Sequence, residues 1–131
     1  ADMDGDGDMD ILSASELDNT IAWYENDGNV NPTWTAADIA TSANGAVTVF
    51  AADMDGDGDM DILSASELDN TIAWYENDGN VNPTWTAADI ATSANGAQSV
   101  FAADMDGDGD MDILSASFND NTILGMRTMA M

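Results

Sequence analysis

The chain has 131 residues, of which 26 are Asp or Glu and only one is Lys or Arg, so its formal charge is −25. Apolar residues make up 44% of it, too many for a simple disordered acidic tail. The charge excludes a nucleic-acid-binding protein, because no cationic surface is present to neutralise phosphates, and it argues against binding to an anionic membrane. With no Cys, His or Lys, the chain also lacks disulfides, thiolate metal sites and most acid–base or nucleophilic chemistry, so we do not expect an enzyme.

Two features of the sequence concern membranes and secretion. No apolar run approaches the roughly 20 residues that span a bilayer, so no membrane insertion is expected. The start at Ala1 is not that of a signal peptide, and we expect either a mature secreted form or an excerpt of a longer protein.

The chain repeats itself with a period of 51 residues. Residues 1–46 recur unchanged as 52–97, and residues 103–117 again copy 1–15. The sequence therefore predicts about two and a half copies of one folding unit. We define repeat 1 as residues 1–51, repeat 2 as 52–102 and the partial repeat 3 as 103–131.

Within each repeat, short β-rich segments are separated by turn residues. Residues 9–15 form a short apolar run, residues 20–25 alternate between two faces, and residues 33–41 are rich in Thr and apolar residues. Asn44-Gly45 is a strong hairpin signal, because both positions tolerate positive φ. We therefore expect ten strands, at 9–15, 20–25, 33–41, 47–52, 60–66, 71–76, 84–92, 98–103, 111–117 and 121–128.

Four short strands per repeat and no helix signal are typical of a β-propeller blade, which has four antiparallel strands. A β-solenoid is the alternative, but its coils are shorter and more regular. We therefore expect an all-β fold with about 2.5 blades per chain.

So few blades would leave sheet edges exposed, because a closed propeller needs at least four. Exposed edges recruit other chains, so a homo-oligomer is expected. Two copies sharing a blade would close a five-bladed ring, whereas a head-to-tail contact that does not close would give a fibre. An excerpt of a longer array is the third alternative.

An acidic segment with Asp at every second position opens each repeat, first at Asp2–Asp10. Its carboxylates would repel one another unless a cation lay between them. Calcium takes six to eight oxygens, and a loop with ligands at positions 1, 3, 5, 7 and 9 wraps around one ion, with Gly at position 6. Gly7 stands at that position, and position 7 would supply the backbone carbonyl of Asp8. Magnesium keeps more water and suits such a loop less well.

The sequence therefore predicts about three Ca²⁺ ions per chain, which would change the formal charge from −25 to −19. The segment after each loop is strand-like, and position 12 is Ser13 rather than Glu, so the loop is not a helical EF-hand. The alternative is a solvated acidic run without an ion, against which the glycine placement and the repetition argue. The predicted ligands are Asp2, Asp4, Asp6, Asp8 and Asp10, with Asp53, Asp55, Asp57, Asp59 and Asp61, and with Asp104, Asp106, Asp108, Asp110 and Asp112.

These segments resemble a known family. FAADMDGDGDMDILSAS, at 50–66, resembles the calcium-loop core of the FG-GAP/VCBS repeats of integrin-α-like β-propellers. LDNTIAWYENDG at 68–79 and NDNTILG at 119–125 resemble the hairpin that follows the loop in bacterial members. The resemblance implies that the acidic loop joins two neighbouring strands of a blade. It also implies a secreted or cell-surface protein that serves in adhesion, carbohydrate binding or assembly.

Other side chains allow further expectations. Exposed tryptophans could stack on a glycan, but packing within or between blades is the favoured interpretation for side chains in alternating strands. The four are Trp23, Trp34, Trp74 and Trp85. Met3 and Met9 would flank the loop as apolar plugs, because a thioether is too soft a ligand for calcium. Arg127, the single cationic side chain, is expected to be solvated.

The tail at 124–131 departs from the repeat. It reads Leu-Gly-Met-Arg-Thr-Met-Ala-Met where residues 73–80 would predict Ala-Trp-Tyr-Glu-Asn-Asp-Gly-Asn. Back-translating the expected segment and deleting its first base gives the observed one, which indicates a frameshift in a longer ancestral array. Under that hypothesis the residues of the tail were never selected as a motif. The alternative is an unrelated capping tail.

Overall fold

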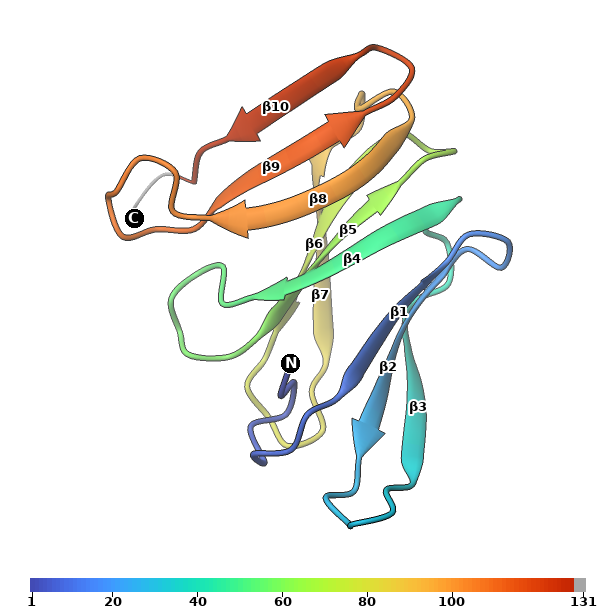
Figure 1. The fold of residues 1–131 in the computed structure, drawn as a ribbon, viewed down its shortest axis with the longest axis vertical. Helices are drawn as coiled ribbons and strands as arrows, with labels where there is room; N and C mark the ends of the chain where they lie inside the picture. The colour runs from blue at the N-terminus through green and yellow to red at the C-terminus, as the bar shows by residue number, and fades with distance from the viewer. Residues whose placement is uncertain (129–131) are drawn as a thin grey trace.

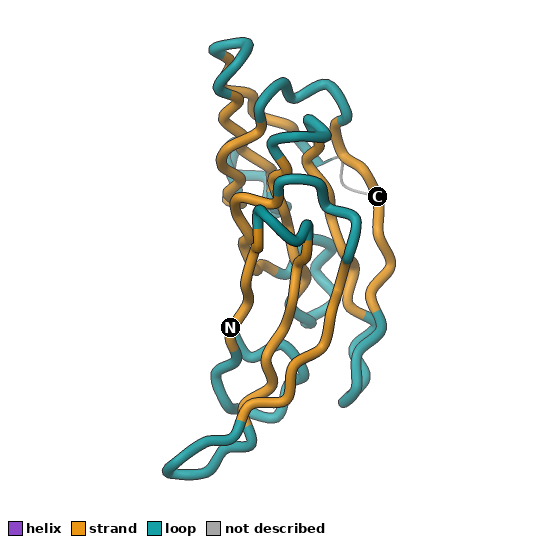
Figure 2. Tube along the Cα trace, turned by 90° about the vertical axis from the view of Figure 1, so that its right-hand side faces the viewer, coloured by secondary structure: helices purple, strands orange, loops and turns teal. Residues whose placement is uncertain are grey.

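A computed structural model describes residues 1–128, so the end of the divergent tail, 129–131, lies outside it. The described residues form ten strands and contain no helix, as predicted (Figure 2). Among them, no helix is long and apolar enough to cross a membrane. The strands are β1 (Ile11–Ser15), β2 (Thr20–Asn26), β3 (Trp34–Ala40), β4 (Ala46–Ala52), β5 (Asp61–Ser66), β6 (Thr71–Asn77), β7 (Trp85–Ala91), β8 (Ala97–Ala103), β9 (Asp112–Ser117) and β10 (Thr122–Met126).

The strands form three antiparallel sheets, which are arranged as successive blades (Figure 1). The first sheet has the order β1-β2-β3, the second β4-β5-β6-β7 and the third β8-β9-β10. The second sheet is a complete four-stranded blade. Compared with it, the described part of the first sheet lacks a counterpart of β4, and that of the third lacks a counterpart of β7. The expected all-β, blade-like architecture is confirmed.

Neighbouring sheets meet through the first strand of each blade. β4 lies beside β8, with the ring centroids of Phe50 and Phe101 4.6 Å apart. The hydroxyl of Thr48 donates a hydrogen bond to the backbone carbonyl of Gln98, at 2.7 Å. These residues occupy nearly equivalent positions in successive repeats, so the second and third sheets are joined through equivalent strands, whereas the first sheet meets β4 through β1 and β2.

Two apolar cores lie between the three sheets. The core between the first and second sheets contains Ile21, Trp23 and Ile62, and the core between the second and third contains Leu63 and Ile72. The middle sheet is therefore covered on both faces, and every residue of β5 is buried. β1 has nearly the same sequence but is only half-buried, because one of its faces has no neighbouring sheet among the described residues.

The Asn44-Gly45 turn does not form the expected β-hairpin, because β3 and β4 belong to different sheets. It instead connects two blades. The N–H of Gly45 donates to Asn19 Oδ1 in the β1–β2 turn, at 2.9 Å, and its carbonyl accepts from Glu67 N in the β5–β6 turn, at 2.8 Å. Gly45 has φ +67°, and an added Cβ would lie 3.0 Å from the backbone nitrogen of Leu68. The positive φ of Gly45, which suggested a hairpin, instead allows a close contact between two blades.

Candidate metal centre

The acidic segments lie at equivalent places in the three sheets. Residues 53–60 connect β4 to β5, and residues 104–111 connect β8 to β9. Each of these loops therefore joins two neighbouring strands of one sheet, as the family resemblance implied. Residues 2–10 precede β1 in the same way, and the carbonyl of Ala1 accepts a hydrogen bond from Asp10 N at 2.8 Å.

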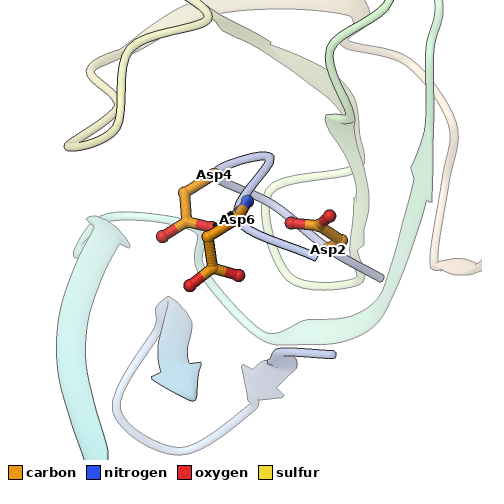
Figure 3. A group of neighbouring side chains, drawn as sticks. All are labelled: Asp2, Asp4 and Asp6. Atoms are coloured by element: carbon orange, nitrogen blue, oxygen red, sulfur yellow. Dashed lines mark hydrogen bonds between the residues drawn. The ribbon is translucent and has the colours of Figure 1, made fainter. Parts of the chain in front are cut away.

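The first three aspartates of each loop converge. In the first loop, one carboxylate oxygen from each of Asp2, Asp4 and Asp6 lies within 4.8 Å of the others (Figure 3). Two ligands of one calcium ion can lie at most about 5 Å apart, since each Ca–O distance is about 2.3–2.6 Å. The separation and the hard oxygen donors both fit calcium. The same grouping recurs in Asp53, Asp55 and Asp57 and in Asp104, Asp106 and Asp108.

The loop backbone is folded around these carboxylates. Asp2 accepts hydrogen bonds from the N–H of Gly5 at 2.8 Å and of Gly7 at 3.0 Å, one on each oxygen. Asp4 accepts from the N–H of Asp6 at 3.2 Å. Gly7 has φ +98°, in the left-handed region that favours glycine. The turn at position 6 therefore brings the ligand side chains to one side of the loop.

The ninth position of each loop has a different environment. Both carboxylate oxygens of Asp61 accept backbone hydrogen bonds, from Met54 N at 3.0 Å and from Asn77 N at 2.9 Å. Asp61 is fully buried, and burial raises its pKa while these hydrogen bonds oppose the rise. Asp10 and Asp112 make the equivalent hydrogen bonds. The ninth aspartate thus fastens the loop to the third strand of the blade and is not part of the converging group.

The seventh position also lies outside the converging group. The side chain of Asp8 lies against Gly28 in the β2–β3 turn, where an added Cβ would come 2.2 Å from Asp8 Oδ2. Asp59 lies against Gly79 in the same way, also at 2.2 Å. These glycines make room for the seventh side chain, which packs under the neighbouring turn. The sequence-based assignment used only the backbone carbonyl of this residue.

The electrostatics of the first loop reflect its crowded charge. Burial raises the pKa of Asp4, and the negative charges of Asp6, Asp10 and Glu25 raise it further. The hydrogen bond from Asp6 N opposes this rise. A cation bound among these carboxylates would remove the repulsion, which is the physical reason to expect one here.

The second residue of the first and second loops fixes the loop to the next blade, whereas its counterpart in the third loop is exposed. Met3 is 1% exposed and packs in the core between the first and second sheets, and Met54 packs in the core between the second and third. The prediction of an apolar plug is confirmed for Met3. It is wrong for Met9, which is 64% exposed, because its side chain lies on the uncovered face of the first sheet.

The tryptophans mostly serve packing. Trp23 is buried, Trp74 and Trp85 are partly buried against the two cores, and Trp34 is 42% exposed. This distribution agrees with the favoured interpretation, packing within and between blades.

Sequence reasoning missed a contact in the third loop. The Nε atom of Arg127 lies 2.9 Å from Asp106 Oδ2 and forms an ion pair with it. Arg127 is exposed to solvent as expected, since its side chain is 69% exposed, but the ion pair with Asp106 was not expected. Alignment of the repeats could have indicated this contact, because Arg127 stands 51 residues after Glu76 and 102 after Glu25. The third repeat therefore has a cationic side chain where the first two have an anionic one.

Comparison with known proteins agrees with this architecture. A sequence model of FG-GAP-like repeats matches residues 2–64 and again residues 53–115. Each match begins in one acidic loop and ends in the strand after the next acidic loop. No curated protein sequence gives a significant match. The two matches together span most of the chain, which belongs to the FG-GAP-like repeat family.

Proposed function

We propose that the chain is a calcium-stabilised extracellular repeat protein with a structural or adhesive role. The observation that supports this most is the convergence of three carboxylates in each of the three acidic loops. Asp2, Asp4 and Asp6 would hold the ion in the first loop, and their counterparts would do so in the others. Affinities of roughly 10⁻⁴–10⁻³ M are typical of extracellular calcium modules.

Calcium would stabilise the fold through the contacts of the loops with the cores. Met3 and Met54 are buried between sheets, so an ordered loop also orders an inter-blade core. Binding to the folded state alone shifts the folding equilibrium by mass action. The ions would also reduce the self-repulsion of a chain whose formal charge is −25.

Removal of calcium tests this proposal. The melting temperature measured in millimolar calcium is expected to fall on addition of EDTA, because calcium at one to ten times its dissociation constant contributes about 0.4–1.4 kcal/mol per site. Magnesium at the same concentration should restore less of the lost stability, since it binds such loops poorly. A melting temperature that does not change between calcium and EDTA would contradict calcium stabilisation.

We further propose that copies associate head to tail by stacking sheets. Ile72 is fully buried between the second and third sheets, whereas its counterpart Ile123 on the third sheet is 81% exposed. Likewise Ile62 is fully buried against the first sheet, whereas its counterpart Ile11 is 48% exposed. The two outer faces therefore present apolar side chains whose counterparts are buried between successive sheets. The described part of the first sheet lacks a counterpart of β4, so a second copy stacked there would bury these side chains through β1 and β2.

Sheet stacking differs from the sharing of a blade that the sequence suggested. The described parts of the first and third sheets have three strands each, so joining them into one blade would bring six strands to a four-stranded unit. A five-bladed ring closed through a shared blade therefore does not fit this topology. Stacking of whole sheets leaves both a larger ring and a fibre as products.

Carbohydrate binding is a second candidate, which a groove between the first and second sheets supports. The groove has a volume of about 470 Å³, within the range of ligand sites. Tyr75, Asp69 and Asp89 line it, and Asp69 Oδ1 is buried without a hydrogen-bond partner among the described residues. Hydroxyl groups of a sugar could satisfy that oxygen. A glycan array read with the wild type and with Asp89→Ala tests this candidate, and binding that is absent or equal in both proteins counts against it.

A further inference from the structure

The third loop has the same scaffold as the other two, although the sequence of the tail beside it has changed. Thr128 N donates to Asp112 Oδ1 at 3.1 Å, and its hydroxyl donates to the carbonyl of Met111 at 2.9 Å. Asn77 makes the equivalent pair of hydrogen bonds in the second repeat, at 2.9 and 3.0 Å. Asp104 accepts from Gly107 N and Gly109 N, as its counterparts do. The loop is therefore held in place by the altered tail.

What differs is the charge of the residue before Thr128. The first and second repeats have Glu25 and Glu76 there, and the third has Arg127. Glu25 directly precedes Asn26, whose N–H donates to Asp10 Oδ1 at 2.9 Å, so in the first repeat this position places a negative charge beside the loop. In the third repeat the guanidinium pairs with Asp106, the counterpart of Asp4, at 2.9 Å.

The altered tail also leaves room for the guanidinium. Gly125 stands where the second repeat has Trp74. A hollow of about 230 Å³ lies there, lined by Gly125, Arg127 and Asp106 among others. The Arg127 side chain is 69% exposed and that of Asp106 is 26% exposed, so the ion pair forms at the mouth of the hollow.

We propose that Arg127 is a resident cation of the third loop, so that this loop binds Ca²⁺ more weakly than the other two. This inference rests on the proposed calcium binding. An ion entering among Asp104, Asp106 and Asp108 must either displace the guanidinium or accept a like charge beside it. Because the ion pair is largely exposed, we expect an affinity about two- to fivefold lower than in the first two loops.

A calcium titration followed by amide NMR tests the inference on the full chain. The glycine at position 6 reports on each loop separately, through Gly7, Gly58 and Gly109. In the wild type, Gly109 should respond at about two- to fivefold higher calcium than the other two. In Arg127→Gln the three should respond together, because the competing cation is gone.

Two further variants complete the design. Glu76→Arg combined with Trp74→Gly gives the second loop the same cation and the same room for it, and should move the response of Gly58 to higher calcium. Ser93→Asp is the control for Arg127→Gln, since it changes the net charge equally but lies in the turn before β8, at the other end of that strand from the third loop. At about 20 Å its charge is screened, so Gly109 should respond as in the wild type.

The outcomes separate this inference from the proposed function. Equal responses of all three loops in the wild type, unchanged in Arg127→Gln, would overturn the inference and leave calcium binding standing. No response in any loop would overturn both. If Arg127→Gln does not fold, Arg127→Glu, which restores the residue of the first two repeats, takes its place. A Gly109 response that stays at the wild-type calcium concentration in that variant contradicts the role of the cation.

Discussion

Asp57 and Asp61 lie four residues apart in the second loop and have different roles. Asp57 is exposed and uses one carboxylate oxygen to accept a hydrogen bond from Asp59 N, at 2.9 Å. Asp61 is fully buried and uses both oxygens to accept backbone hydrogen bonds. Asp57 thus has an oxygen available to a cation, whereas Asp61 belongs to the folded scaffold.

Replacement of each by Asn separates these roles. Asp61→Asn replaces one acceptor with an NH₂ group that faces a buried N–H, and should lower the free energy of unfolding by about 2 kcal/mol even in EDTA. Asp57→Asn keeps its one acceptor oxygen, so it should lower stability only when calcium is present. Denaturant unfolding with and without calcium measures both. Equal losses for Asp61→Asn and Asp57→Asn in EDTA would contradict the assignment.

At the scale of an element, the β6–β7 turn is organised by one exposed carboxylate. The hydroxyl of Thr84 donates to Asp78, and Asn80 N donates to it at 3.2 Å. These hydrogen bonds, that from Thr84 first, lower the pKa of Asp78 to about 2. In the β2–β3 turn, Asp27 accepts the equivalent hydrogen bonds from Thr33 and Asn29, and its pKa is also about 2. The two turns are therefore organised by equivalent hydrogen bonds to one aspartate.

Because these hydrogen bonds favour the ionised carboxylate, the stability of the turn depends on pH in the acidic range. A carboxyl whose pKa is lowered on folding stabilises the folded state above its ordinary value of 3.8, and this stabilisation is lost as the pH falls from there to about 2. NMR titration should find Asp78 with a pKa of about 2 in the wild type. In Thr84→Val the pKa should rise toward the ordinary value, while that of Asp27 stays low as an internal control. An Asp78 pKa near 3.8 in the wild type would refute this account.

The elements were largely predictable because their boundaries carry chemical signals. Asn, Gly and Pro mark the turns, and the ten predicted strands lie close to the observed ones. The Asn44-Gly45 turn was misread because positive φ is a local property, whereas the sheet to which the next strand belongs is not. Regular spacing likewise could not show that Asp61 faces two backbone N–H groups. That role depends on β6, 16 residues further along the chain.

At the scale of the whole molecule, the outer faces of the first and third sheets should control association. Ile123→Lys places a charge on the face that we expect a second copy to cover, so it should reduce the particle mass toward the 13.7 kDa of one chain. Val30 is fully exposed in a loop, so Val30→Lys is the matched control and should associate like the wild type. Light scattering in calcium measures both. Unchanged association in Ile123→Lys would contradict stacking through this face.

The identity of β2 and β6 affects how the chain chooses its pairings. Residues 20–26 and 71–77 have the same sequence, so side-chain contacts do not favour pairing of β5 with β6 over pairing with β2. Proximity decides instead, because β5 reaches β6 across residues 67–70 but reaches β2 only across residues 27–60. The shorter closure is favoured by roughly 2 kcal/mol. Between molecules in a concentrated refolding mixture this advantage shrinks, so strands of one molecule would be exchanged with those of another.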